Sequence, residues 1–217
     1  MFRLAFSIVV LAIAGAVHAQ TISLADLEAR VNERSTMLSG YEVYLRDPDP
    51  NRAMAAFQIM LESGDPTLVQ LALSIGVYSP DTNIRQTALK AFFAGKPSLD
   101  LFFQGADMDE NRTDHYPRWM KGLGGSAGGK DSGSASFKVG EWSDELGCYM
   151  NHNDQKACLL RVNATTISIF LNNADKWIAP QWVNLTLSDS GNMVGSILGD
   201  INGERFGVLA ITLPLAE

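Results

Sequence analysis

A run rich in Gly and Ser contains the pattern of a nucleophile elbow. Residues 124–128 read G-x-S-x-G, with Ser126 at the nucleophile position. That chemistry requires a buried strand before the serine, a helix after it and a histidine base within reach. The preceding residues, Tyr116 to Lys121, do not read as a buried strand, and more Gly and Ser follow. Because such a run produces this pattern by composition alone, we expect no serine hydrolase.

The same run also satisfies the phosphate-loop pattern G-x-x-x-x-G-K from Gly124 to Lys130. A phosphate loop continues with Ser or Thr, whose hydroxyl holds Mg²⁺. Asp131 stands at that position, and its carboxylate would repel phosphate. We therefore predict neither a nucleotide site nor any other cofactor.

Three alternate positions resemble the start of a calcium-binding EF-hand loop, namely Asp107, Asp109 and Asn111. The loop then requires a glycine, where Arg112 stands, and a bidentate glutamate, where Arg118 stands. A solvated acidic loop is the better interpretation. These three residues stay as weak calcium candidates in a looser loop, and we predict no other metal site.

The sequence contains too few histidines to indicate a zinc site or a histidine-dependent catalytic triad. Apart from His18 in the N-terminal leader, the chain holds His115 and His152, which lie in different segments. A zinc site or a His-dependent triad needs further partners. Paired-carboxylate catalysis needs only two acids that meet in space, so a hydrolase whose carboxylate site is invisible in the sequence is one alternative function.

Large aromatic residues gather in the C-terminal part of the chain: Trp142, Trp177 and Trp182, together with Tyr149. Aromatic side chains usually fill a core. Exposed on a small sheet, they would stack on sugar rings. Trp182 alternates with Val183, Leu185 and Leu187 and falls on the opposite face, so we name the three tryptophans as candidate ligand-binding aromatics and a carbohydrate-binding module as a second alternative.

The N-terminus has the three parts of a cleavable signal peptide. Arg3 supplies a positive charge, an uncharged run follows from Ala5 to Val17, and small residues at Val17 and Ala19 precede Gln20. The run is too short for a membrane span, which needs about 20 apolar residues. We predict that residues 1–19 are removed and that the mature protein is periplasmic or secreted, with no membrane-spanning segment.

The two cysteines, Cys148 and Cys158, are the only ones in the chain. An isolated pair outside the cytoplasm usually forms a disulfide. The polar segment between them reads as a hairpin with the cysteines facing each other. Because redox-active pairs are typically Cys-x-x-Cys, we predict a structural disulfide here.

The formal net charge is −7, and no cluster of Lys and Arg appears. We therefore expect neither nucleic acid nor an anionic membrane surface as a partner, since both require a basic face.

Residues 20–103 read as a helical domain. Leu24, Leu27 and Val31 repeat at helical spacing after a capping pair, Ser23 and Asp26, and Leu38, Tyr41 and Leu45 extend that face. Three further helices are separated by the breaks 47–50, 64–66 and 79–81, which contain Asp, Gly and Pro.

The segment 81–89, which reads DTNIRQTAL, resembles the second helix of a HEAT repeat. The resemblance covers one or two helical pairs over residues 50–95. HEAT arrays bind proteins on a concave face, so the resemblance implies a protein partner. Solenoids need about three or more repeats to bury a continuous core. The helices must therefore bury their apolar faces on each other or on the C-terminal half.

Residues 104–134 read as a polar and Gly/Ser-rich linker, and residues 135–217 read as strands. Residues 166–171 and 182–187 alternate between apolar and polar positions, a turn falls at 189–192, and Asn202-Gly203 is a strong hairpin signal. The last strand, 205–213, is apolar on both faces and is therefore expected at a central position.

Together these patterns predict an α+β protein, with an N-terminal HEAT-like helical unit followed by a C-terminal antiparallel β-sandwich or small barrel. The favoured function is a non-enzymatic binding or interaction protein whose partner is a protein or another envelope component.

Overall fold

A computed structural model describes residues 22–112, 114–163, 165–172 and 179–215. These residues belong to two compact units, one ending at Gly40 and the other covering Tyr41–Glu217. The predicted signal peptide, residues 1–19, lies outside the described residues. The helices are α1 (Leu24–Leu45), α2 (Pro50–Glu62), α3 (Pro66–Gly76), α4 (Thr82–Ala94), the 3₁₀ turn η1 (Glu110–Arg112) and α5 (His115–Gly122). The strands are β1 (Ser98–Met108), β2 (Ser126–Ala127), β3 (Ser132–Ser143), β4 (Cys148–Asn151), β5 (Asp154–Asn163), β6 (Thr166–Leu171), β7 (Gln181–Leu187), β8 (Asn192–Ile201) and β9 (Glu204–Pro214).

The breaks between the first four helices follow from capping chemistry. Asp49, Asp65 and Asp81 precede α2, α3 and α4, and each carboxylate accepts a hydrogen bond from a backbone N–H in the first turn. Pro50 and Pro66 occupy the first helical position, where no N–H is needed. The predicted helix limits are therefore confirmed. Membership of the HEAT class stays a prediction.

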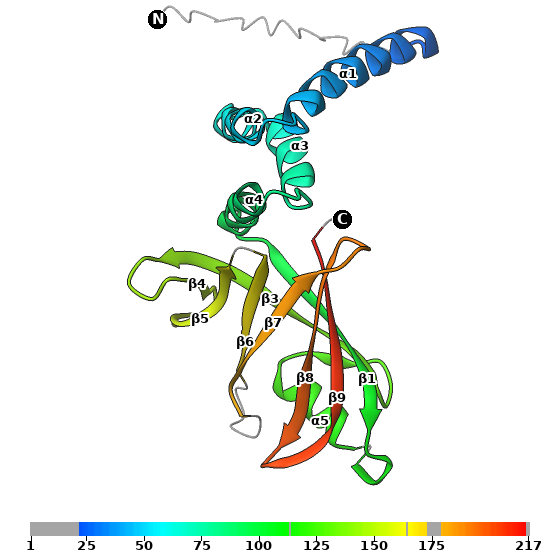
Figure 1. The fold of residues 1–217 in the computed structure, drawn as a ribbon. Coiled ribbons are helices and arrows are strands. Elements are labelled where there is room, and N and C mark those ends of the chain that lie inside the picture. Colours follow the sequence, from blue (N-terminus) through cyan, green and yellow to red (C-terminus); the bar gives the residue numbers. More distant parts are fainter. Residues whose placement is uncertain (1–21, 113, 164, 173–178, 216–217) are drawn as a thin grey trace, which may run out of the picture. The chain divides into compact units, whose positions relative to one another are not determined.

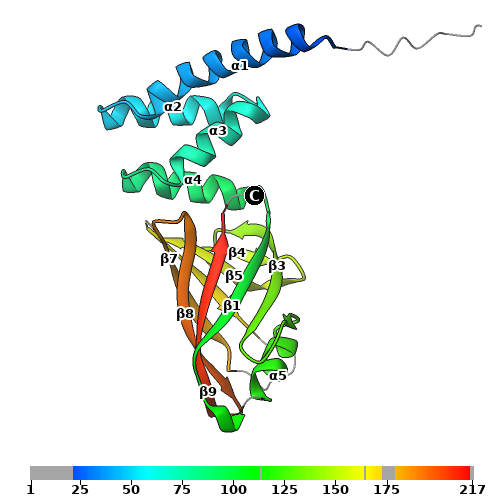
Figure 2. The ribbon, with the colours of Figure 1, turned by 90° about the vertical axis from the view of Figure 1, so that its right-hand side faces the viewer.

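The strands form one antiparallel sheet that closes on itself. Its order is β1-β9-β8-β7-β6-β5-β4-β3-β2, and β1 also pairs with β3, so eight strands make a ring. Figure 1 and Figure 2 show the strands curving around a common axis. The α+β prediction with a sandwich or barrel-like C-terminal part is confirmed. The last strand is central, between β1 and β8, as its apolar pattern predicts.

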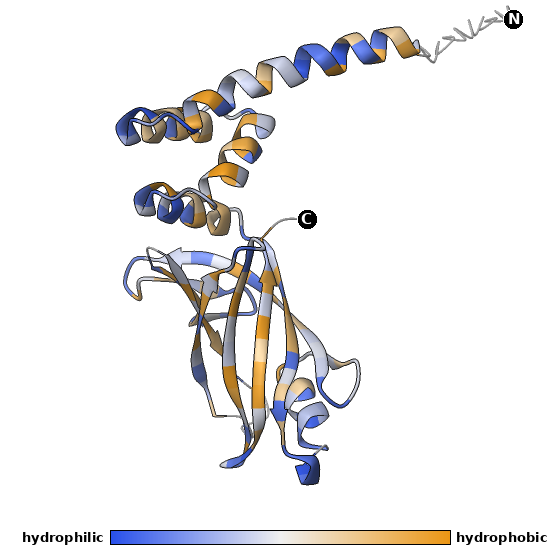
Figure 3. Ribbon diagram, turned by 45° about the vertical axis from the view of Figure 1, so that its right-hand side comes forward, coloured by the Kyte–Doolittle hydropathy of each residue, from blue (hydrophilic) through white to orange (hydrophobic). Residues whose placement is uncertain are grey.

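The core lies inside this ring and continues into the helices. Alternate residues of β1, Leu99, Leu101 and Phe103, are almost fully buried, whereas the residues between them face outward. Figure 3 shows the resulting alternation of colour along the strands. At one end the Tyr149 hydroxyl donates to the carbonyl of Lys90 in α4 at 2.7 Å. Helices α2, α3 and α4 therefore bury apolar residues on each other and, through α4, on the sheet.

The linker prediction for residues 104–134 is wrong. This segment holds the end of β1, α5, β2 and the start of β3. Its glycines permit close packing: a Cβ on Gly133 would lie 2.6 Å from the Ser126 carbonyl oxygen and 2.8 Å from the Tyr116 hydroxyl. The first strand also begins at Ser98, inside the predicted helical domain, rather than at 135.

None of the helices in the described ranges has both the length and the apolar character needed to cross a membrane.

Candidate interaction surfaces

Helix α1 exposes an apolar stripe. Leu24 is 72% exposed, Leu27 49% and Val31 56%. Their spacing of three and four residues places them on one side of the helix. We call these three side chains the α1 stripe. Further along the same helix Tyr41 packs against the core of the second unit and Leu45 is buried in it, so the spacing predicted in the sequence continues into residues that do pack.

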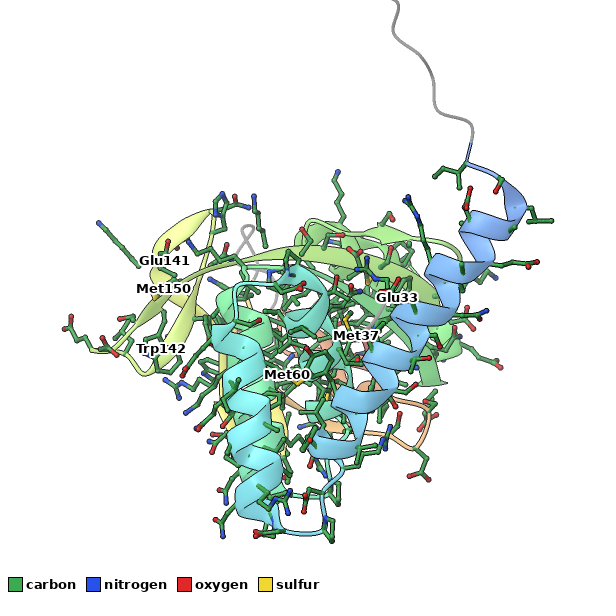
Figure 4. The ribbon with its side chains drawn as sticks, turned by 90° about the horizontal axis from the view of Figure 1, so that it is seen from above. Glu33, Met37, Met60, Glu141, Trp142 and Met150 are labelled. Atoms are coloured by element: carbon green, nitrogen blue, oxygen red, sulfur yellow. A yellow bond between two sulfur atoms is a disulfide. The ribbon has the colours of Figure 1, made fainter. Side chains whose placement is uncertain are left out.

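The N-terminus of α1 is fixed locally. The Asp26 backbone N–H donates to the Ser23 hydroxyl at 3.1 Å, and that hydroxyl donates to the Asp26 carboxylate at 2.6 Å. The helix therefore starts immediately before the stripe. Figure 4 labels Glu33 and Met37, one turn apart on the same helix. Charged residues of both signs lie close to the stripe in the sequence: Arg30 immediately precedes Val31, and Glu33 follows it.

A second surface surrounds Phe102, whose side chain points outward from β1 and is 49% exposed. Its cross-strand neighbours are Ser134 on β3 and Thr212 on β9. Two hollows open beside the phenyl ring of Phe102. One, of about 320 Å³, lies toward α3 and α4, and the other, of about 330 Å³, lies toward β2 and β3. We call this surface the Phe102 face.

The candidate tryptophans do not form one row. Trp142 on β3 makes an edge contact with Tyr149, with ring centroids 5.0 Å apart, and its Nε1 donates to Asp144 at 2.8 Å. It lies with Glu141 and Met150 on β3 and β4 (Figure 4). Trp182 lies on β7, and β4, β5 and β6 separate these two strands in the sheet. Trp177 lies outside the described residues.

Trp182 is 38% exposed but has partners of its own. The Arg161 guanidinium lies 4.5 Å from the centre of its ring, and the Phe170 ring is 5.1 Å away. A cation over an aromatic face is attracted by the negative charge of that face. The side of Trp182 that Arg161 covers is therefore occupied within the chain itself.

The residues that the sequence suggested for catalysis or metal binding do not form such a site in the described part of the chain. Ser126 follows α5 and begins a short strand, the reverse of the strand–serine–helix order of a nucleophile elbow. Asp109 accepts a hydrogen bond from the Asn111 backbone N–H and forms an ion pair with Arg112, and Asp107 sits at an irregularity of β1. Within the described ranges, no three His, Cys, Asp or Glu side chains group as metal ligands.

The predicted disulfide is present. Cys148 on β4 and Cys158 on β5 are bonded, with their Cα atoms 5.8 Å apart. The hairpin between them carries His152 at an exposed position, and its backbone N–H donates to the Lys138 carbonyl. The pair therefore ties β4 to β5 at the edge where the sheet meets α4.

Sequence reasoning missed the Phe102 face, because Phe102 falls in a strand that was assigned to the helical domain. The signal was available: Leu99, Leu101 and Phe103 alternate with Asp100, Phe102 and Gln104 in the period of a half-buried strand. No known protein family, curated protein or solved structure matches this chain.

Proposed function

We propose that this chain is an exported, non-enzymatic interaction protein that binds a protein partner through the α1 stripe. The observation that carries the proposal is the exposure of Leu24, Leu27 and Val31 on one side of a helix. Anchors spaced in this way are how an amphipathic helix enters the apolar groove of a partner protein.

Burial of the α1 stripe by a partner would be energetically favourable. Most of the stability of a helix in a protein comes from the packing of its apolar face, and the described part of the first unit, up to Gly40, contains α1 alone. Complete burial of a Leu or Val side chain contributes about 1.5–3 kcal/mol. A groove that covers the stripe would therefore stabilise the helix and the complex together.

Export is supported by two independent features. The N-terminal sequence has the parts of a signal peptide, and Cys148 and Cys158 are bonded to each other. Disulfides persist in oxidising compartments and are rare in the cytoplasm. We therefore propose that the partner is met in the periplasm or outside the cell.

Photo-cross-linking in intact cells tests the proposal. A photo-reactive residue replaces Glu28, beside the stripe, and adducts are identified by mass spectrometry. We expect one discrete adduct with a protein. The adduct should disappear when Leu24→Ser and Val31→Ser are combined, because both anchors are then lost.

The matched control combines Ala25→Ser and Ala29→Ser, which change exposed positions on the other sides of the same helix. This control should leave the adduct unchanged. An adduct that survives the stripe variant, or that the control abolishes equally, would show that the stripe is not the binding surface. Processing is checked separately, since a mature chain that retains Met1 contradicts export.

A further inference from the structure

The Phe102 face differs from the other exposed aromatics in one respect. Trp142 and Trp182 each contact another ring, and Trp182 also lies under a guanidinium. For Phe102 no ring or cation contact is found within the described part of the chain. Its neighbours across the strands, Ser134 and Thr212, are small. The two cross-strand neighbours of Phe102 therefore each carry a hydroxyl group.

Polar and apolar side chains together line the two hollows beside the Phe102 side chain. The polar or hydroxyl-bearing residues of the hollow toward the helices are Gln70, Ser74, Tyr78, Ser98 and Asp100, and its apolar residues besides Phe102 are Leu73, Val77, Phe92, Pro214 and Leu215. The hollow toward β2 and β3 presents Gln104, Ser126, Ser132, Ser134 and Thr212.

The polar groups of the two hollows are hydroxyls and amides with a single charge. The one carboxylate, Asp100, already accepts a hydrogen bond from the Ser136 hydroxyl. Hydroxyls and amides both donate and accept, so they suit a neutral ligand that carries many hydroxyl groups. A phosphate or nucleic-acid ligand would require basic residues, and neither hollow is lined by Lys or Arg.

A second aromatic ring lines the hollow toward the helices. Tyr78 is 42% exposed, and its hydroxyl donates to the Gly191 carbonyl at 3.1 Å. This bond joins the end of α3 to the β7–β8 turn and fixes the tyrosine ring beside the hollow. The ligand would therefore meet one ring standing on the sheet and another held by the helices.

We propose that the Phe102 face binds a neutral glycan chain. One side of a pyranose ring consists of C–H groups, whose partial positive charge is attracted to the negative face of an aromatic ring. The hydroxyls around the sugar then bond to the side chains of the two hollows, on either side of Phe102. A protein partner fits this surface less well, because Ser is depleted at protein–protein interfaces and hot spots favour Trp, Tyr and Arg. The site shares no residue with the α1 stripe and does not depend on the protein partner proposed above.

Titration calorimetry with the mature chain tests this proposal. The probes are the hexasaccharides of cellulose, chitin, starch and laminarin, which are uncharged and differ in linkage. We expect at least one to bind and to shift the NMR signals of the Phe102 ring. Phe102→Ala should weaken that binding by about tenfold or more, as expected when one stacked ring is lost.

The matched control is Trp182→Ala, which removes a ring of similar exposure from another part of the sheet. It should leave the affinity unchanged, and Phe102→Tyr should retain binding because the ring remains. Phe102 is half exposed, so its removal should not unfold the chain, which circular dichroism checks. Three results would each overturn the proposal. None of the four sugars binds, or Trp182→Ala rather than Phe102→Ala abolishes binding, or an apolar peptide binds at this face in preference to the sugars.

Discussion

Gly76 at the end of α3 permits three helices to meet, and Gly76→Ala tests this packing. A Cβ at this position would lie 2.5 Å from the Phe57 ring on α2 and 2.9 Å from the Ala88 Cβ on α4. Phe57 and Ala88 are both fully buried. Neither neighbour can therefore move away without disturbing the core that surrounds it.

The magnitude follows from two opposing effects. Adding a methyl group to a well-packed core costs about 1–3 kcal/mol, while replacing Gly by Ala in a helix gains up to about 1 kcal/mol. The gain is smaller here because Gly76 is the last residue of α3. We expect a net loss of about 1–2 kcal/mol in the free energy of unfolding. For a chain of this size the melting temperature should fall by roughly 2–8 °C.

The assay is urea unfolding of the mature chain, followed by tryptophan fluorescence and circular dichroism. The control is Gly40→Ala in α1, where a Cβ would meet nothing within 4 Å. At Gly40 the same substitution should stabilise the helix locally by about 0.5–1 kcal/mol and raise the helix content. It should not destabilise the chain. A Gly76→Ala variant as stable as the parent protein would refute the packing of α2, α3 and α4 described above.

Three further perturbations test other contacts. Reducing the Cys148–Cys158 bond should lower the free energy of unfolding by about 3 kcal/mol, the chain-entropy value for so short a loop; equal urea midpoints with and without reductant would contradict this. Burial, with the charge of Asp131 nearby, raises the pKa of Tyr116 from 10.0 to about 12. The folded state then keeps a proton that the unfolded state loses, so stability should fall as the pH rises from 10 toward 12. Tyr116→Phe should reduce this loss of stability between pH 10 and 12. An unchanged dependence of the free energy of unfolding on pH would contradict the burial of Tyr116 as its cause. Tyr149→Phe removes the hydrogen bond to the Lys90 carbonyl and should cost about 1 kcal/mol in urea unfolding; no measurable loss would mean that this bond does not hold α4 to the sheet.

The helical part could be predicted from sequence because its limits are set by neighbouring residues. Each aspartate cap and its following helix lie within a few positions of each other, so the pattern contains the whole cause. The hairpin turn at Asn202-Gly203 is equally local, since both residues adopt a positive φ. Such features need no knowledge of the rest of the fold.

Residues 98–134 could not be predicted in the same way because their structure depends on distant partners. β1 pairs with β9 about a hundred residues later, and α5 buries Tyr116 and Trp119 against Phe206 on β9. The glycines at 125 and 133 suggested flexibility, but they allow close approach of neighbouring backbone and side chains. A single sequence does not separate these two uses of glycine.

The candidate surfaces could likewise be predicted from the sequence only in part. The spacing of the α1 stripe is visible in the sequence, although its exposure is not. Phe102 could not be chosen over the tryptophans, since only the structure gives Trp142 and Trp182 their partners.

The position of β1 also has a consequence for the order of assembly. β1 lies between β3 and β9, and β9 occupies residues 204–214 near the C-terminus. The ring of strands can close only after β9, about a hundred residues beyond β1 in the sequence, has reached the compartment in which the chain folds. Until then β1 lacks one of its neighbours, and an unpaired strand edge is a template for aggregation. A translocated chain in which β9 has not yet paired with β1 would therefore be a suitable client for a chaperone.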